Sequence, residues 1–260
     1  TVERDVVAWV ARESLLCPRY GLNCCRVTPD LAEEGLPLRA LGLAGAESLR
    51  NVLSNSPDIT IGIGHGRTLS AAVHQLPHLD APHMRFVSLL GCLTRNYALN
   101  PHDVMHRIAE KTGAQAYMMP VPFFANTQED RDVLLKQRGV SEVFAMAAQS
   151  EVKLVGIGTV EPAAQLVEAG MIDEAEINDI SAAGAVGELL GHFFDANGQM
   201  IHNSLTARTL SVELDLAHRA EIVALVGGLS KVDAIRAVLA SGLVTGLITD
   251  ELTAQALIAD

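Results

Sequence analysis

The sequence predicts an α/β fold built on a doubly wound, mostly parallel sheet, because short apolar segments alternate with helical ones along its 260 residues. Several of the expected strands are mainly apolar runs without alternation, which is typical of strands covered on both faces. Aromatic residues make up only 4% of the chain, so small and branched residues must fill the core between helices and sheet. In such sheets, ligands bind at the carboxyl ends of the strands, near the point where the strand order reverses.

The first half of the chain contains four expected strands, each followed by a helix. An N-terminal helical pattern through Val2, Val6 and Val10 precedes the first strand, which ends at Thr28 and Pro29. The expected strands are 24–27, 59–64, 85–91 and 115–120, and the expected helices are 38–54, one from near Thr68, 101–112 and 127–137.

The second half adds strands at 152–158, 221–228 and 244–249, with helices from Lys231 and after Asp250. Segment 184–210 breaks the alternation with four glycines, and we interpret it as a strand and turn inserted near the sheet edge as a small subdomain. No linker is visible, so one domain is expected over residues 1–260. The helical pattern at the first residue indicates a fragment of a longer protein.

The charge of the chain argues against direct binding to nucleic acid. Its formal net charge is −12, and it has no basic run, so its surface repels phosphate backbones. No apolar run reaches the roughly 20 residues that span a membrane, and no signal peptide is visible, which predicts a cytoplasmic protein without a membrane partner. The four cysteines lack metal-ligand spacing and are expected to be free thiols.

The strongest candidate site is the loop between the expected strand at 59–64 and the helix that follows it. Gly64 and Gly66, with His65 between them, allow the backbone to turn tightly and to approach a ligand. The helix start offers unpaired N–H groups, while Arg67 adds charge and Thr68 adds a hydroxyl. This combination suits an anion such as phosphate, although a tight turn without a ligand would use the same glycines.

Two other chemistries are disfavoured. Arg67 occupies the position where a dinucleotide-binding motif needs its third glycine, and no Gly-Lys-Ser/Thr follows, as a P-loop requires. A nucleotide-dependent oxidoreductase is therefore not supported, and no cofactor is expected. His102 and His106 are four residues apart on an expected helix, but no metalloprotease pattern surrounds them, so no metal site is expected either.

The second candidate is the turn after the expected strand at 221–228. Gly228 precedes Ser230 and Lys231, and Ser230 with Asp233 matches a capping box. A lysine in the first helical turn is electrostatically unfavourable unless a bound anion offsets it. Lys231 is therefore either a phosphate ligand or a solvated surface residue.

Three weaker candidates also follow expected strands. Leu90 and Gly91 lie at the end of the 85–91 strand and offer backbone N–H groups or an apolar wall. Gly158 ends the 152–158 strand. Asp195 precedes Asn197 and Gly198, a combination that usually forms a turn, but its carboxylate is also suited to sugar hydroxyls.

Together these motifs resemble the effector-binding domain of SorC-type sugar-operon transcriptional regulators. The resemblance extends over essentially the whole chain. The segments that carry it are Gly62–Leu69, Phe194–Gly198 and Gly227–Lys231, with an opening that runs from Leu15 through Arg19–Asn23 to Arg26–Pro29.

The resemblance implies the fold of ribose-5-phosphate isomerase and glucosamine-6-phosphate deaminase. It implies a phosphorylated sugar effector, with sorbose-operon regulators as the most similar members, and no catalytic activity. It also implies an upstream helix-turn-helix that contacts operator DNA, and a full regulator that is a tetramer. A homo-oligomer, dimer or tetramer, is therefore expected. Gly64, Gly66 and Thr68 would form a phosphate loop that Lys231 also reaches, and Asp195 would bind hydroxyls.

Two departures from related proteins matter. The related deaminases carry an Asp-Gly-His run after the central strand, and this chain has Gly156–Pro162 there, without that proton-transfer pair. Leu90 replaces an arginine found in glycolytic regulators, which argues against a second phosphate. The alternative to a sensor is a sugar-phosphate isomerase or deaminase-like enzyme, whose base would be Glu161 or Asp195.

Overall fold

The computed structural model describes residues 2–56, 58–98, 100, 102–162, 164–216 and 220–259, and the side chains from Val7 onward. Its main sheet has seven strands, all parallel, in the spatial order β1-β11-β10-β5-β2-β3-β4. The strands are β1 (Cys24–Thr28), β2 (Thr60–Ile63), β3 (Arg85–Leu93), β4 (Gln115–Pro122), β5 (Val152–Val155), β10 (Glu221–Leu225) and β11 (Gly246–Asp250).

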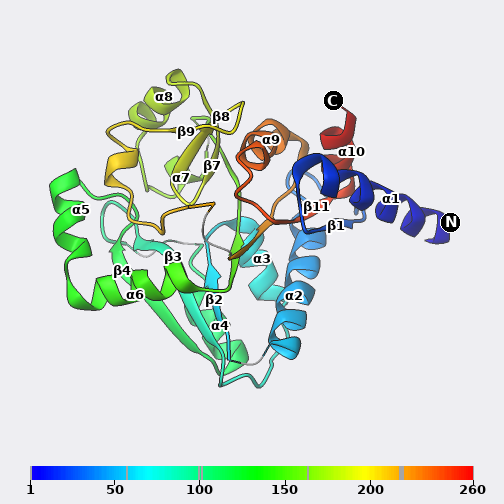
Figure 1. Ribbon diagram of the computed structural model, residues 1–260, viewed down its shortest axis with the longest axis horizontal. Coiled ribbons are helices and arrows are strands. Elements are labelled where there is room, and N and C mark those ends of the chain that lie inside the picture. Colours follow the sequence, from blue (N-terminus) through cyan, green and yellow to red (C-terminus); the bar gives the residue numbers. More distant parts are fainter. Residues whose placement is uncertain are drawn as a thin grey trace.

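Helices cover both faces of the main sheet (Figure 1). The helices are α1 (Val2–Tyr20), α2 (Leu38–Asn55), α3 (Arg67–Gln75), α4 (Met105–Thr112), α5 (Gln128–Leu135), α6 (Arg138–Gln149), α7 (Gln165–Glu168), α8 (Glu174–Ala182), α9 (Val232–Ala240) and α10 (Glu251–Ala259). Alternate strand residues face opposite layers, so that Ile61 and Leu154 pack with α2, α3 and α4, whereas Val87 and Val155 pack with α1, α6 and α10. These layers confirm the predicted doubly wound α/β class.

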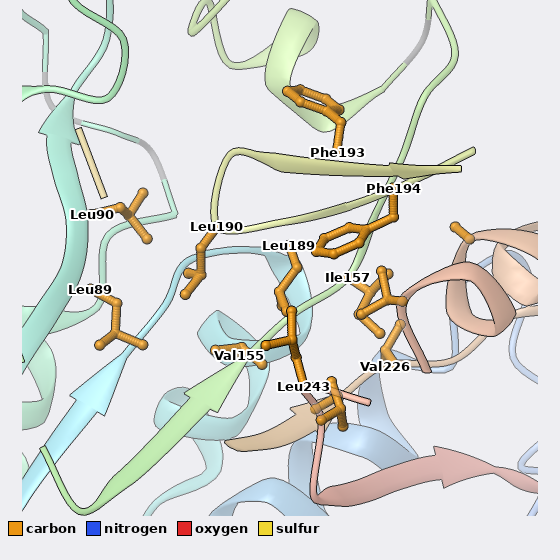
Figure 2. Packing of buried hydrophobic residues seen from close by; sticks show 14 of the residues in the cluster. Leu89, Leu90, Val155, Ile157, Leu189, Leu190, Phe193, Phe194, Val226 and Leu243 are labelled. Carbon is orange, nitrogen blue, oxygen red and sulfur yellow. The ribbon is translucent and has the colours of Figure 1, made fainter. Parts of the chain in front are cut away.

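A second, antiparallel sheet is inserted between β5 and β10 in the order β6-β7-β8-β9. Its strands are β6 (Gly158–Thr159), β7 (Ala185–Leu189), β8 (His192–Asp195) and β9 (Met200–Ile201). Figure 2 shows Leu189 and Phe194 on the side that faces Val155 and Ile157, with Phe193 on the opposite side. The insertion therefore packs over the carboxyl ends of the main strands. The sequence analysis placed it near the sheet edge, and that expectation is wrong.

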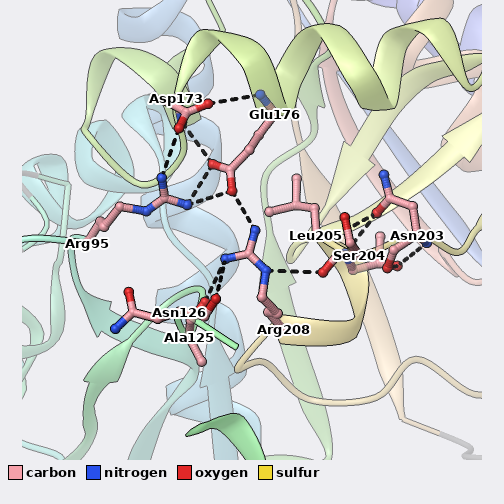
Figure 3. A network of polar contacts seen from close by, with 10 residues as sticks. Arg95, Ala125, Asn126, Asp173, Glu176, Asn203, Ser204, Leu205 and Arg208 are labelled. Atoms are coloured by element: carbon pink, nitrogen blue, oxygen red, sulfur yellow. Dashed lines mark hydrogen bonds and ion pairs between the residues drawn. The ribbon is translucent and has the colours of Figure 1, made fainter. Parts of the chain in front are cut away.

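A partly exposed ion-pair network attaches this insertion to the segments that follow β3 and β4 (Figure 3). Glu176 in α8 accepts hydrogen bonds from Arg95 (2.6 Å) and Arg208 (2.5 Å). Arg208 also donates to the carbonyl of Ala125, which follows β4, at 2.8 Å. Asp173 caps α8 and pairs with Arg95 at 3.1 Å. Three separate chain segments therefore meet at one carboxylate, and Arg208 extends the network to a fourth.

The strand order places the reversal point between β2 and β5. From β2 the chain proceeds outward to β3 and β4, whereas from β5 it proceeds the other way to β10 and β11. The carboxyl ends of β2 and β5 are neighbours, and the N–H of Gly64 donates to the carbonyl of Leu154 at 2.8 Å. This is the position where sheets of this kind bind ligands.

Several boundaries differ from the predictions. The strand expected at 152–158 stops at Val155, because Gly158 turns into the second sheet. Gly91 does not end a strand, since β3 continues to Leu93 and Gly91 admits a close approach of β4, whose Pro122 carbonyl would lie 2.4 Å from any Cβ there. α4 begins at Met105 instead of 101, and Pro101 lies outside the described residues. α6 was not predicted.

Two general features concern the whole described part of the chain. Among these residues, no helix combines the length and the apolar character needed to cross a bilayer. They also hold no group of three or more metal-ligating side chains. All four cysteines are free, as predicted, and Cys24 is exposed.

Candidate functional site

The loop from Gly64 to Gly66 forms an open helix N-terminus. Gly66 is the N-cap of α3, with φ 124° and ψ 168°, and no side chain of the described residues caps this end. That φ value is accessible to glycine and strained for other residues. The first N–H groups of α3 therefore remain available to a ligand, next to the positive end of the helix dipole.

An inner cavity of about 30 Å³ lies beside this helix end. It brings together residues from the loops that follow β2 and β5, from α3 and α7, from the second sheet and from the turn before α9. The lining residues are Leu36, His65, Gly66, Arg67, Thr68, Gly156, Ile157, Gly158, Thr159, Gln165, Leu166, Glu188, Leu190 and Lys231.

Lys231 is buried, which excludes the solvated surface position that the sequence left open. Its side chain reaches the inner cavity, the residue is 9% exposed, and Nζ donates to the carbonyl of Ile157 at 2.7 Å. Burial lowers the pKa of Lys231 to about 8, and the charge of Arg67 adds to this effect, while Glu188 opposes it. The predicted capping box is absent, because Lys231 itself is the N-cap of α9 and has no side-chain cap bond.

Two buried N–H donors in the cavity wall lack a partner. Arg67 Nε and Gln165 Nε2 have no hydrogen-bond acceptor among the described residues. Buried polar groups are rarely left unpaired, because the desolvation cost is not recovered. Both residues line the inner cavity, so a ligand oxygen there would satisfy donors that the protein leaves free.

Glu188 places one carboxylate in the inner cavity, which Arg67 and Lys231 also line. It is 4% exposed, and its Oε1 accepts the N–H of Gly191 at 2.5 Å. Burial raises the pKa of Glu188 to about 7, against the opposing effects of that hydrogen bond and of Lys231. A Cβ at position 158 would lie 2.4 Å from Oε2, so Gly158 leaves room for this carboxylate in its observed position.

His65 and Thr68 have structural partners within the site. Burial lowers the pKa of His65 to about 4, helped by His102 and Lys231, so its ring is neutral at pH 7. Its Nδ1 lies 3.1 Å from the side-chain amide of Asn100. The Thr68 hydroxyl donates to the carbonyl of Leu225 at 2.8 Å, which leaves its backbone N–H for a ligand.

An outer cavity of about 570 Å³ adjoins the inner one. The two share Leu36, Arg67, Thr159 and Lys231, so the cations stand at their junction. The outer chamber contrasts with the inner one because four carboxylates line it. Its lining residues are Asp30, Glu33, Gly35, Leu36, Pro37, Arg67, Thr159, Glu161, Gly228, Leu229, Ser230, Lys231, Asp250 and Leu252.

The structure does not bring every predicted residue to these cavities. Gly228 lines the outer chamber, whereas Gly64 lines neither cavity and packs near Leu190 and Leu69. Leu90 and Gly91 line neither cavity, and Leu90 bridges to Ser211. Asp195 is also absent from both linings, because its Oδ1 accepts the N–H groups of Asn197 and Gln199 at 2.9 and 2.8 Å and so shapes the turn before β9.

Sequence reasoning missed Gln165 and Glu188. Glu188 could have been found from the sequence, because it is a single acid within the otherwise apolar run 185–190. An acidic residue is rarely buried without a role. Gln165 gave none, because a glutamine at the start of a four-residue helix has no distinctive pattern.

Comparison with known proteins places this geometry in context. Residues 4–259 match the family model described as "Putative sugar-binding domain". The chain is 60% identical over 258 residues to the erythritol catabolism regulatory protein EryD of Brucella abortus, covering 99% of this chain and 82% of that protein. It is 33% identical to the transcriptional regulator LsrR of Enterobacter sp., covering 96% of this chain and 76% of that protein.

Solved structures share the fold. A DeoR family transcriptional regulator from Listeria monocytogenes superposes with a TM-score of 0.85 at 22% identity, covering 96% of this chain and 99% of that one. The full-length sorbitol operon regulator SorC from Klebsiella pneumoniae gives a TM-score of 0.82 at 22% identity, covering 96% and 81%. At these identities the likeness establishes the architecture alone.

Proposed function

The chain belongs to the sugar-binding domain family of SorC-type sugar-operon regulators, and on that premise we propose that its two joined cavities bind a phosphorylated sugar or polyol as effector. The observation that carries this proposal is the pair of unpaired buried donors, Arg67 Nε and Gln165 Nε2, beside the buried amine of Lys231. A neutral sugar would not require two cations at one end of its site.

The phosphate end lies at the junction of the two cavities. Arg67 and Lys231 supply positive charge there, and the open N-terminus of α3 supplies backbone N–H groups. Charge-assisted hydrogen bonds to phosphate are about twice as strong as neutral ones. A dianion would also offset the cost of keeping the Lys231 amine buried and charged.

The hydroxyl end faces the outer chamber. Glu33 already accepts two backbone N–H groups at the start of α2, and Asp250 caps α10. Glu161 is exposed at the chamber wall, so its carboxylate is open to hydroxyl donors. Glu188 approaches the inner side. Carboxylates that surround a cationic end therefore fit a molecule with a phosphate at one terminus and hydroxyls along the rest.

The effector class follows from the regulator of erythritol catabolism, which is 60% identical to this chain. A four-carbon polyol or sugar phosphate is the first candidate, and a sorbose-related phosphate is the second. The outer chamber of about 570 Å³ accommodates either. The inner cavity of about 30 Å³ is much the smaller of the two, so the sugar body is assigned to the outer chamber.

A thermal-shift screen tests the proposal. Erythritol, D-erythritol 4-phosphate, sorbose 1-phosphate, ribose 5-phosphate and inorganic phosphate are compared at equal concentration. Stabilisation by phosphorylated compounds, lost in a Lys231→Ala variant, is the expected result. Stabilisation by erythritol alone would overturn the phosphate assignment.

An enzyme remains the second candidate because of one specific observation. Glu188, with a pKa near 7, and Lys231, with a pKa near 8, share one cavity, and groups poised near neutrality suit acid–base chemistry. The relatives are named as regulators, which favours a sensor. Conversion of ribose 5-phosphate to ribulose 5-phosphate with sustained turnover would reverse this preference.

The chain is the sugar-binding domain of a transcriptional regulator of sugar catabolism. We propose that a helix-turn-helix on the N-terminal side contacts operator DNA, since this chain has a net charge of −12 and is itself a poor DNA ligand. We also propose a cytoplasmic homo-oligomer, dimer or tetramer, whose two arrangements differ in effector affinity.

A further inference from the structure

The outer wall of the effector cavity is connected to the N-terminal helix α1 by way of the first residue of α10. Asp250 and Leu252 line the outer chamber, and the residue between them, Glu251, is bound on the other side to α1. Trp9 Nε1 donates to Glu251 Oε2 at 3.2 Å. Arg12 Nη1 lies 2.8 Å from Glu251 Oε1, as a close ion pair without the alignment of a hydrogen bond.

Asp250 makes this wall stiff. Its Oδ2 accepts the N–H of Gly228 at 2.9 Å and the hydroxyl of Thr253 at 2.5 Å, and its Oδ1 accepts the N–H of Thr253 at 3.0 Å. A Cβ at position 227 would lie 2.1 Å from Oδ2. The Gly227–Lys231 turn and the first turn of α10 are therefore fixed to the same carboxylate.

The opposite wall of the chamber is attached to α1 as well. Glu13 Oε1 accepts the N–H of Val27 at 2.8 Å, and β1 then runs into the loop whose Asp30 and Glu33 line the chamber. The two walls also meet within the main sheet, where Thr28 pairs with Asp250. Both sides of the cavity mouth are thus connected to α1. The two residues of α1 that make these connections, Glu13 and Trp9, are about one helical turn apart.

At its C-terminal end, α1 is fixed more firmly to α10. Arg19 Nη1 donates to the carbonyl of Ile258 at 2.8 Å, and Tyr20 Oη donates to that of Leu257 at 3.1 Å. Leu16 is fully buried between them and the sheet. The other end of α1 extends beyond the body of the molecule (Figure 1), with Val10 exposed. A small shift at Glu251 would therefore be amplified toward the N-terminal end.

We infer that effector occupancy is transmitted to α1 through Glu251 and Glu13. This inference rests on the proposed function, because it requires a ligand in the outer chamber. A ligand that contacts the 30–37 loop and the Gly228–Lys231 turn together draws the two walls toward each other. The contacts of Trp9, Arg12 and Glu13 then differ between the occupied and the empty domain, which is the differential interaction that coupling requires.

Trp9 provides a direct readout, because it is the single tryptophan of the chain. The domain is titrated with D-erythritol 4-phosphate while Trp9 emission is recorded, and calorimetry measures binding independently. A saturable change in emission is expected, with the same midpoint as the calorimetric curve. Calorimetric binding without any change at Trp9 overturns the coupling alone, whereas no binding of any phosphorylated compound in the panel overturns the proposed function and the coupling with it.

Two variants separate coupling from local effects. Glu13→Gln weakens the hydrogen bond from the N–H of Val27 and leaves the hydrogen bond from Trp9 to Glu251 in place, and it should reduce the emission change at saturation. Glu251→Gln should abolish that change, while calorimetric affinity stays within about threefold, or about 0.7 kcal/mol, of wild type. Glu142→Gln, in an exposed pair on α6, has the same charge change and should respond like wild type. A full response in Glu13→Gln and Glu251→Gln would refute the inference.

Discussion

Replacing Lys231 with methionine should affect stability and binding in opposite directions. The buried amine has a pKa lowered from 10.5 to about 8, and each pKa unit corresponds to about 1.4 kcal/mol. A lysine whose pKa is lower in the folded state destabilises that state below the folded pKa, and this penalty fades as pH rises from 8 to 10.5. At pH 7 the charged amine therefore costs the empty domain on the order of 3 kcal/mol.

Part of that cost is recovered by the hydrogen bond to the carbonyl of Ile157. Methionine would leave this carbonyl unpaired, at about 1–3 kcal/mol. The empty Lys231→Met domain should thus range from equally stable to about 2 kcal/mol more stable than wild type. Binding should weaken, since loss of one charge-assisted bond to phosphate costs about 1.5–3 kcal/mol, or roughly 10- to 150-fold in Kd.

Urea denaturation at pH 7 and calorimetry with D-erythritol 4-phosphate measure the two effects. Lys136→Met is the matched control, because Lys136 is exposed and lines neither cavity. It should leave both stability and Kd near wild type. An unchanged Kd in Lys231→Met would refute the phosphate role of this amine, and a large loss of stability would refute the argument that its burial is costly.

Three other predictions test separate parts of the structure. Gly66→Ala should destabilise the domain by about 1–3 kcal/mol in urea, because its φ of 124° strains any side chain, whereas Gly139→Ala, with open space around its Cβ, should be neutral or stabilising by up to about 1 kcal/mol. Glu176→Gln should cost on the order of 3 kcal/mol in thermal melts, because its carboxylate is 17% exposed between two arginines, while Glu142→Gln should cost less than about 0.5 kcal/mol. Calorimetry from pH 7 to 9.5 should show weaker binding as Lys231 loses its charge above about 8, and constant affinity across that range would exclude an electrostatic contribution from this residue.

Local features of the fold were predictable from the sequence because their causes are local. The α3 start needed a glycine at position 66, whatever surrounds it, since its φ is determined by the turn itself. The parallel strands were visible as apolar runs because both faces are covered by helices. The same reasoning identified Lys231 as unusual, since a lysine at a helix start is electrostatically unfavourable.

Features that depend on distant contacts were not predictable. Gly158 and Glu188 are 30 residues apart, and only the antiparallel pairing of β6 with β7 places the carboxylate against the glycine. α6 was missed because it begins at Arg138 and Gly139 without a capping side chain, although Val140 and Phe144 are spaced for one face. Its packing on the sheet, and not its sequence signals, makes it a helix.

Asp195 illustrates how a resemblance and a residue pattern can differ. The pattern around it indicated a turn, and the structure shows that turn, with two backbone N–H groups on Oδ1. The ligand role implied by the resemblance stays a prediction, and one carboxylate oxygen remains for it. Asp195→Asn would keep much of the turn, because an asparagine oxygen accepts the same two bonds, so an affinity loss in that variant would be attributable to the ligand.

The charge of the chain limits which anions it can bind. A net charge of −12 disfavours a long polyanion, whose phosphates must lie along an acidic surface. A small dianion meets a different field, because salt screens exposed charges beyond about 8 Å at physiological ionic strength, while buried groups are screened much less. Within that range the proposed ligand would meet Arg67, Lys231 and the α3 N-terminus. On this proposal the same acidic domain would repel DNA and still hold a phosphosugar, and the operator contact would lie elsewhere in the regulator.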